Sequence, residues 1–156
     1  MTAARLFAAT ALACFASVAA ALVSQHAFGM QPCPWCVLQR LIFLVIGIVA
    51  LTGWAWRSRA GRHIAATIAA VLSVCGLASA LWQHFVAAKS PSCNLTLADR
   101  IINATTLNGL LPDVFEARAS CADAAVDLLG VPYALWAAAL FALSAVAMVE
   151  VLRRPA

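Results

Sequence analysis

Charge is scarce in this chain. Only 10 of its 156 residues are Lys or Arg and only 6 are Asp or Glu, so 10% of the sequence is charged, against roughly 25% in soluble domains. Proteins that bind nucleic acid spread basic residues over a hydrated face, and so few charges exclude that class. The net charge of +4 is better explained by basic residues that set the orientation of a protein in a membrane.

Apolar residues dominate instead, at 65% of the chain with a mean hydropathy of +0.94. Four apolar runs are each long enough to cross a bilayer as a helix, about 6–24, 37–56, 64–85 and 133–152. We therefore predict an all-α integral membrane protein in which residues 1–156 form one domain, a four-transmembrane-helix bundle with one long loop at about 87–131. A cleaved signal peptide is the alternative for the first run, but its 19 residues exceed the apolar region of about 7–15 that such peptides have.

Basic residues predict the orientation of the bundle. Six of the ten fall on one side of the predicted membrane, namely Arg5, Arg57, Arg59, Arg62, Arg153 and Arg154. Cytoplasmic segments carry the excess of Lys and Arg. Both termini are therefore expected in the cytoplasm and the long loop outside it. Within that loop, residues 97–107 can form a short amphipathic helix with Leu97, Ile101 and Ala104 on one face, lying either on the membrane or against its neighbours.

The six cysteines divide into two groups. Cys14 and Cys75 lie inside apolar runs, where a lone cysteine usually behaves as a small buried hydrophobic residue. The other four lie outside the runs and on the predicted outer side, and an even number there suggests two disulfides: Cys33, Cys36, Cys93 and Cys121. Four outward cysteines holding a zinc ion are an alternative.

Cys33 and Cys36 form a Cys-x-x-Cys motif at the start of the second predicted span, and Arg40 follows one helical turn later. A helix N-terminus and a nearby positive charge both favour the thiolate, which makes a redox-active pair the preferred interpretation. A purely structural disulfide here would close a very short loop and remove little chain entropy. Arg40 could instead extend its charge to the membrane surface, and His84, near the end of the third span, could bind a polar ligand or anchor the interface.

Cys93 and Cys121 lie 28 positions apart in the long loop. A structural bridge between them would contribute about 3–4 kcal/mol through loop-closure entropy. Because a second cysteine pair is predicted on the same side of the membrane, a relay by thiol–disulfide exchange is the competing interpretation.

These features together resemble the bacterial DsbB disulfide-bond formation proteins. The likeness covers four spans, the outward Cys-x-x-Cys with Arg40, the second pair in the last outward loop, Trp82-Gln83-His84, and Asp127-Leu128-Leu129-Gly130 after Cys121. Pro34-Trp35 between the cysteines departs from the apolar pair expected in that family, which affects the expected redox potential of the motif rather than its role.

The resemblance implies an enzyme of the bacterial inner membrane that reoxidises a DsbA-like periplasmic thiol oxidant and passes the electrons to ubiquinone or menaquinone, with no metal. It implies that Cys93 forms the mixed disulfide with the partner and that Cys121 pairs with Cys93 and then engages Cys33. Cys36 would be the thiolate beside the quinone, with Arg40 and His84 at the quinone site. An acceptor of high potential is needed because DsbA, at about −120 mV, cannot be reoxidised by an ordinary dithiol at about −270 mV.

Two other classes also fit four spans. Vitamin K epoxide reductase homologues run similar chemistry, but their loop pair of cysteines comes first along the chain. A tetraspanin-like interaction protein would have structural disulfides in its loop and would not need Arg40 beside a Cys-x-x-Cys motif.

Overall fold

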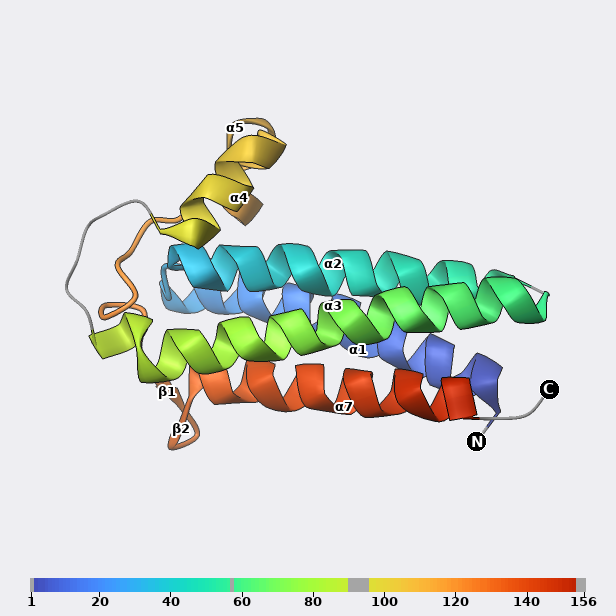
Figure 1. Cartoon of the computed structure of the whole chain (residues 1–156). Helices are drawn as coiled ribbons and strands as arrows, with labels where there is room; N and C mark the ends of the chain where they lie inside the picture. The colour runs from blue at the N-terminus through green and yellow to red at the C-terminus, as the bar shows by residue number, and fades with distance from the viewer. Residues whose placement is uncertain (1, 57, 90–95, 154–156) are drawn as a thin grey trace.

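Four long helices run side by side through most of the chain (Figure 1): α1 (Ala3–Phe28), α2 (Pro34–Ala55), α3 (Arg59–Phe85) and α7 (Tyr133–Arg153). The structure is a computed structural model and describes residues 2–56, 58–89 and 96–153. All four helices are long and apolar enough to cross a membrane. The predicted fold class is confirmed, and the chain is a multi-pass, all-α membrane protein.

Local sequence signals set where these helices begin and end. Pro34 is the first residue of α2, where its missing N–H costs nothing, and Cys33 precedes it as the N-cap. Ser58 caps α3 by accepting the backbone N–H of Gly61 at 3.1 Å. α1 ends at Phe28, and its C-cap Gly29 has a φ of +67°, a left-handed conformation that glycine adopts without a steric penalty. The turn between α1 and α2 therefore places the cysteine motif at a helix N-terminus.

The helices pack in a ring in which α1 contacts α2 and α7, and α3 contacts α2 and α7. At the centre, the rings of Phe43 and Phe141 stack with their centroids 3.9 Å apart. Gly76 permits this arrangement, because a Cβ atom at that position would overlap the ring of Phe141. The outer faces carry large exposed apolar side chains suited to lipid, among them Leu12, Ile48, Leu51, Ile64, Val71 and Val146.

The two cysteines inside the spans differ in burial. Cys14 is 1% exposed and packs in the bundle core, as predicted. Cys75 is exposed, so the prediction that it is buried was wrong. It lies on the outer side of α3, where lipid can solvate an apolar thiol as well as a protein core can.

The segment between α3 and α7 contains η1 (Ala87–Lys89), α4 (Leu97–Thr105), α5 (Leu107–Leu110), α6 (Pro112–Phe115), β1 (Asp127–Leu128) and β2 (Val131–Pro132). The two short strands form an antiparallel hairpin that leads directly into α7. This segment lies at the end of the bundle opposite to the one where α1 begins and α7 ends (Figure 1). The predicted loop is thus a small folded cap on one end of the bundle.

The predicted amphipathic helix is present as α4, and Thr96 and Asp99 form a capping box at its start. Its packed face differs from the predicted one. Ala98 and Ile102 are buried against α2, whereas Leu97 is 62% exposed and Ile101 37% exposed. α4 therefore packs as part of the cap through the face next to the predicted apolar stripe.

Candidate redox site

Three cysteines meet at the capped end of the bundle. The sulfurs of Cys33 and Cys36 are in hydrogen-bond contact at 2.8 Å. The Cys33 thiol also hydrogen-bonds with Cys121, which comes from the segment after α6. Cys33 thus lies between the other two, and it is fully buried. Cys93, the fourth predicted redox cysteine, lies outside the described residues.

Backbone contacts hold these distant parts of the sequence together. The N–H groups of Arg118 and Ala119 both donate to the carbonyl of Pro32, at 2.9 and 3.2 Å. This contact fixes the segment that leads to Cys121 beside the segment that leads to Cys33. Within the motif itself, the Cys36 N–H donates to the Cys33 sulfur at 3.3 Å, as an N-cap interaction.

Apolar side chains from the cap close over the cysteines. Cys33 and Cys121 belong to a buried cluster that also contains Trp35 from α2, Ile102 from α4 and Phe115 from α6. Such a cover excludes water and strengthens every polar contact beneath it.

The surroundings shift the pKa values of the Cys33 and Cys121 thiols in opposite directions. The pKa of Cys33 is raised, first because of its hydrogen bond with Cys121, then because of that with Cys36 and because of burial. The pKa of Cys121 is lowered, chiefly because the Cys33 thiol donates to its sulfur. Of the two, Cys121 is the better nucleophile, since the thiolate is the reactive form.

Arg40 is buried, at 6% exposure, and points its guanidinium at neutral acceptors. Its Nη1 donates to Gln25 Oε1 at 2.7 Å and to the Val114 carbonyl at 3.1 Å, and its Nη2 donates to the Ala21 carbonyl at 3.4 Å. Ion pairs join Arg118 to Asp113 and Glu116, and among the described residues no carboxylate pairs with Arg40. The positive charge of Arg40 is therefore held in place without a carboxylate, as a site for an anion or a polarised carbonyl requires.

Three glutamines complete the polar end of the site. Gln83 of α3 donates from Nε2 to the Cys36 sulfur at 3.1 Å, and Gln39 of α2 donates from Nε2 to Gln83 Oε1 at 2.7 Å. Gln25 of α1 accepts from Arg40 and donates to the Asp113 carbonyl at 3.2 Å. The sequence pointed to Gln83 only as part of the Trp82-Gln83-His84 motif and gave none of the three a role, although an uncharged polar side chain within or beside an apolar span is a signal that could have found them.

His84 lies one residue beyond Gln83, near the end of α3. Its ring is half-buried and makes an edge-on contact with the ring of Phe85, with centroids 4.7 Å apart. It is Gln83, the preceding residue, that reaches Cys36. The role of His84 at a quinone site stays a prediction.

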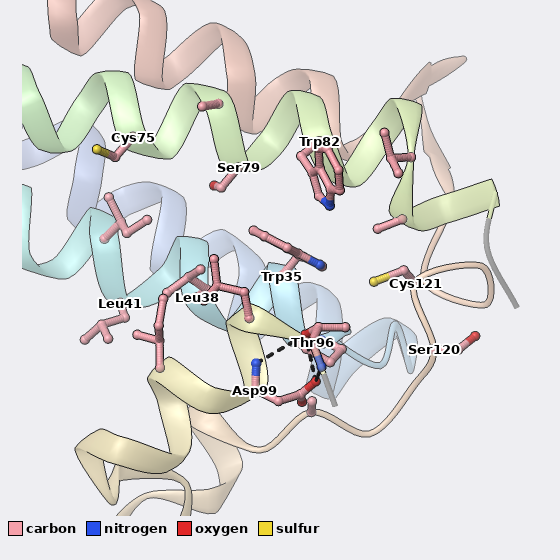
Figure 2. A pocket seen from close by; sticks show the side chains of 18 of the residues that line it. Trp35, Leu38, Leu41, Cys75, Ser79, Trp82, Thr96, Asp99, Ser120 and Cys121 are labelled. Atoms are coloured by element: carbon pink, nitrogen blue, oxygen red, sulfur yellow. Dashed lines mark hydrogen bonds between the residues drawn. The ribbon is translucent and has the colours of Figure 1, made fainter. Parts of the chain in front are cut away.

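Two cavities flank the cysteine cluster. The larger, about 1480 Å³, lies between α2, α3 and the cap, and Cys121, Trp35 and Trp82 line it. Figure 2 shows Cys121 at the end of this cavity nearest the two tryptophans and Cys75 farther along α3. The smaller cavity, about 770 Å³, lies between α1, α2 and α7, and Cys36, Gln39, Arg40 and Gln83 line it. In the second cavity, the Cys36 sulfur and the guanidinium of Arg40 face the same space.

The fold has four membrane-spanning helices with a cluster of thiols at one end. This arrangement is typical of membrane proteins that carry out thiol–disulfide exchange. The family model described as "Disulfide bond formation protein DsbB" matches residues 3–151. The chain is 32% identical over 134 residues to disulfide bond formation protein B of Pseudomonas syringae pv. tomato, covering 85% of this chain and 79% of that one. It is 34% identical over 140 residues to the protein of the same name from Dechloromonas aromatica, covering 87% and 84%. A search of the solved structures gave no significant match.

The chain belongs to the DsbB family of disulfide bond formation proteins. The resemblance drawn from its motifs is confirmed, and an oxidoreductase acting on disulfides fits both the family and the site.

Proposed function

We propose that this protein reoxidises a DsbA-like dithiol protein outside the cytoplasm and transfers the two electrons to a membrane quinone. The observation that carries the proposal is the order of groups at the capped end of the bundle. Cys121 contacts Cys33, Cys33 contacts Cys36, and Cys36 shares a cavity with the guanidinium of Arg40, which bonds neutral acceptors. This order connects the aqueous cap to a cavity among the spans.

The thiol chemistry follows from this order. The oxidised enzyme would hold two disulfides, Cys33–Cys36 and Cys93–Cys121. Exchange of the partner dithiol with the Cys93–Cys121 disulfide would release Cys121 as a thiol. The Cys121 thiolate then attacks the Cys33 sulfur, so that a Cys121–Cys33 bond forms, the Cys33–Cys36 bond breaks and Cys36 leaves as a thiolate. One thiolate is consumed and one is released, so the charge balances. The part assigned to Cys93 rests on the family resemblance.

The cavity that Cys36 and Arg40 line fits a quinone. Its walls are mostly apolar side chains of α1, α2 and α7, suitable for a ring with a hydrocarbon tail, and Gln39, Arg40 and Gln83 line it together with Cys36. Once Cys93 has re-formed its disulfide with Cys121 and released Cys33 as a thiol, Cys33 and Cys36 would re-form their disulfide and give two electrons to a bound quinone, which with two protons would become the quinol. Arg40 would orient a carbonyl oxygen of the ring and stabilise negative charge beside Cys36, which its neutral acceptors leave it free to do.

The capped end would face the periplasm of a bacterial inner membrane. Support for this orientation comes from the sequence, because six of the ten basic residues belong to the segments at the other ends of the four predicted spans. Labelling of Cys121 with a membrane-impermeant thiol reagent in intact, reduced cells tests it. Labelling that requires a broken inner membrane would contradict both the orientation and the partner.

The decisive experiment uses the purified protein in detergent, a reduced DsbA-like protein and ubiquinone or menaquinone. We expect quinol to form and partner thiols to disappear in a ratio of one quinol to two thiols. Cys36→Ala should abolish quinol formation, because the sulfur that faces the cavity is lost. Partner oxidation without quinol formation would contradict the proposal, and a protein inert toward both substrates would favour a non-enzymatic interaction protein.

A further inference from the structure

The Cys36 sulfur lies opposite a buried pair of amides on α2 and α3. Gln83 is 4% exposed and Gln39 is 5% exposed, and they are joined to each other at 2.7 Å. Gln83 places its Nε2 3.1 Å from the Cys36 sulfur. We propose that Gln83 is a catalytic hydrogen-bond donor that stabilises Cys36 as the leaving thiolate, and that Gln39 is the residue that holds the Gln83 amide in the donating orientation. The inference deepens the proposed function and rests on it.

The orientation of the Gln83 amide is set by its partner. A glutamine side chain has a donating end and an accepting end, and rotation by half a turn exchanges them. Because Gln39 donates to Gln83 Oε1, the accepting end is occupied and the N–H₂ group faces the sulfur. Without Gln39, the carbonyl end could face a thiolate, and two electron-rich atoms would repel each other.

Cys36 needs such a donor at one particular step. When the Cys121 thiolate bonds to the Cys33 sulfur, the electron pair of the broken Cys33–Cys36 bond stays on Cys36. Cys33 can no longer donate to Cys36 at that moment, because its sulfur is bonded to Cys121. Among the described residues, Gln83 is the other side chain in hydrogen-bond contact with the Cys36 sulfur. A charge-assisted hydrogen bond under an apolar cover is stronger than one between neutral groups.

The charged and titratable groups around Cys36 come from two elements. Cys33 and Arg40 flank it on its own helix, and Cys121 approaches from the cap. From α3, the group that faces it is the neutral amide of Gln83. Arg40 acts on the thiolate through its charge, whereas Gln83 acts through a direct hydrogen bond, so the two contributions can be separated by mutation.

The alternative is that the amides only join α2 to α3. Interhelical glutamine contacts are common in membrane bundles and stabilise them modestly. In that case a substitution would lower the stability of the bundle and leave the reactivity of Cys36 unchanged. The two explanations therefore differ in a chemical readout at the sulfur itself.

The test measures the alkylation rate of Cys36 by iodoacetamide in the full-length reduced protein at a fixed neutral pH, by mass spectrometry of the Cys36 peptide. Gln83→Met keeps the length of the side chain and removes the amide, and Gln39→Met releases the Gln83 amide. We expect Gln83→Met to slow alkylation about tenfold or more, since a donor to a charged group is lost. Gln39→Met should slow it less, and the double variant should be no slower than Gln83→Met alone, because Gln39 acts through Gln83.

Ser73→Ala is the matched control, because Ser73 is a fully buried polar residue of α3 whose hydroxyl donates to the Ala69 carbonyl within its own helix. It should leave the alkylation rate unchanged. A folded Gln83→Met protein with the wild-type rate overturns the inference. If Gln83→Met does not fold, the wild-type rate in folded Gln39→Met overturns it equally. Quinol formation by the wild type is measured in parallel, so a failure of the proposed quinone function is distinguished from a failure of the Gln83 inference.

Discussion

Replacing Arg40 with lysine separates the charge of this residue from its shape. Arginine reaches two elements at once, because Nη1 bonds Gln25 Oε1 and the Val114 carbonyl while Nη2 bonds the Ala21 carbonyl. A lysine ammonium is a single point with no planar fork, so it cannot keep these acceptors and also face the cavity. We therefore expect Arg40→Lys to fold and to keep the local positive charge, but to bind quinone poorly.

The size of the effect follows from the contacts that are lost. A hydrogen bond to a charged group contributes about 1.5–3 kcal/mol, and every 1.4 kcal/mol corresponds to about a tenfold change in affinity. Losing one such contact to a quinone carbonyl should raise the quinone KM about ten- to a hundredfold. Exchange between the partner and the cysteines of the cap should change little, because it does not involve the cavity.

The assay follows quinol formation at several quinone concentrations and, separately, partner oxidation in a single turnover. Arg62→Lys is the control, because Arg62 is a half-buried arginine of α3 that donates to the Trp56 carbonyl at the opposite end of the bundle. An Arg40→Lys enzyme with the wild-type quinone KM and turnover would refute the reasoning. It would show that Arg40 only extends its charge toward the membrane surface, which lysine does equally well.

Three further predictions concern packing and the thiols. Gly76→Ala should lower the free energy of unfolding by about 1–3 kcal/mol, because the added methyl group overlaps Phe141; an unchanged thermal midpoint in detergent would contradict the packing. The hydrogen bond from Cys33 lowers the pKa of Cys121, so Cys33→Ala should move the pH midpoint of Cys121 alkylation to higher pH. Cys33→Ser keeps a hydrogen-bond donor and should move the midpoint less. Equal midpoints in the wild type and both variants would show that Cys33 does not donate to Cys121. Because Cys33 is fully buried, the Cys33–Cys36 disulfide of Cys121→Ala should resist reduction by the reduced partner protein, as followed by non-reducing mass spectrometry. Rapid reduction in that variant would show that the partner protein reaches this disulfide directly.

The sequence by itself determined the elements and the chemistry that they carry. Apolar runs of sufficient length form membrane helices, because a helix hydrogen-bonds every backbone polar group within the bilayer. Pro34 favours the first position of α2 regardless of how that helix packs against the others. It thereby places Cys36 at a helix N-terminus with Arg40 one turn away. The burial of Cys14 was predicted as well, although the same reasoning failed for Cys75.

Only the tertiary structure decided which side of each helix faces the site. In a water-soluble helix a polar face marks the outside, but in a membrane both the core and the lipid are apolar, so an apolar span gives little sign of its rotation. For this reason the sequence did not show that Gln83 rather than His84 reaches Cys36, nor that Cys75 faces outward. The contact between Cys121 and Cys33 depends on the backbone bonds to Pro32, which join residues too distant in the chain for local patterns to connect.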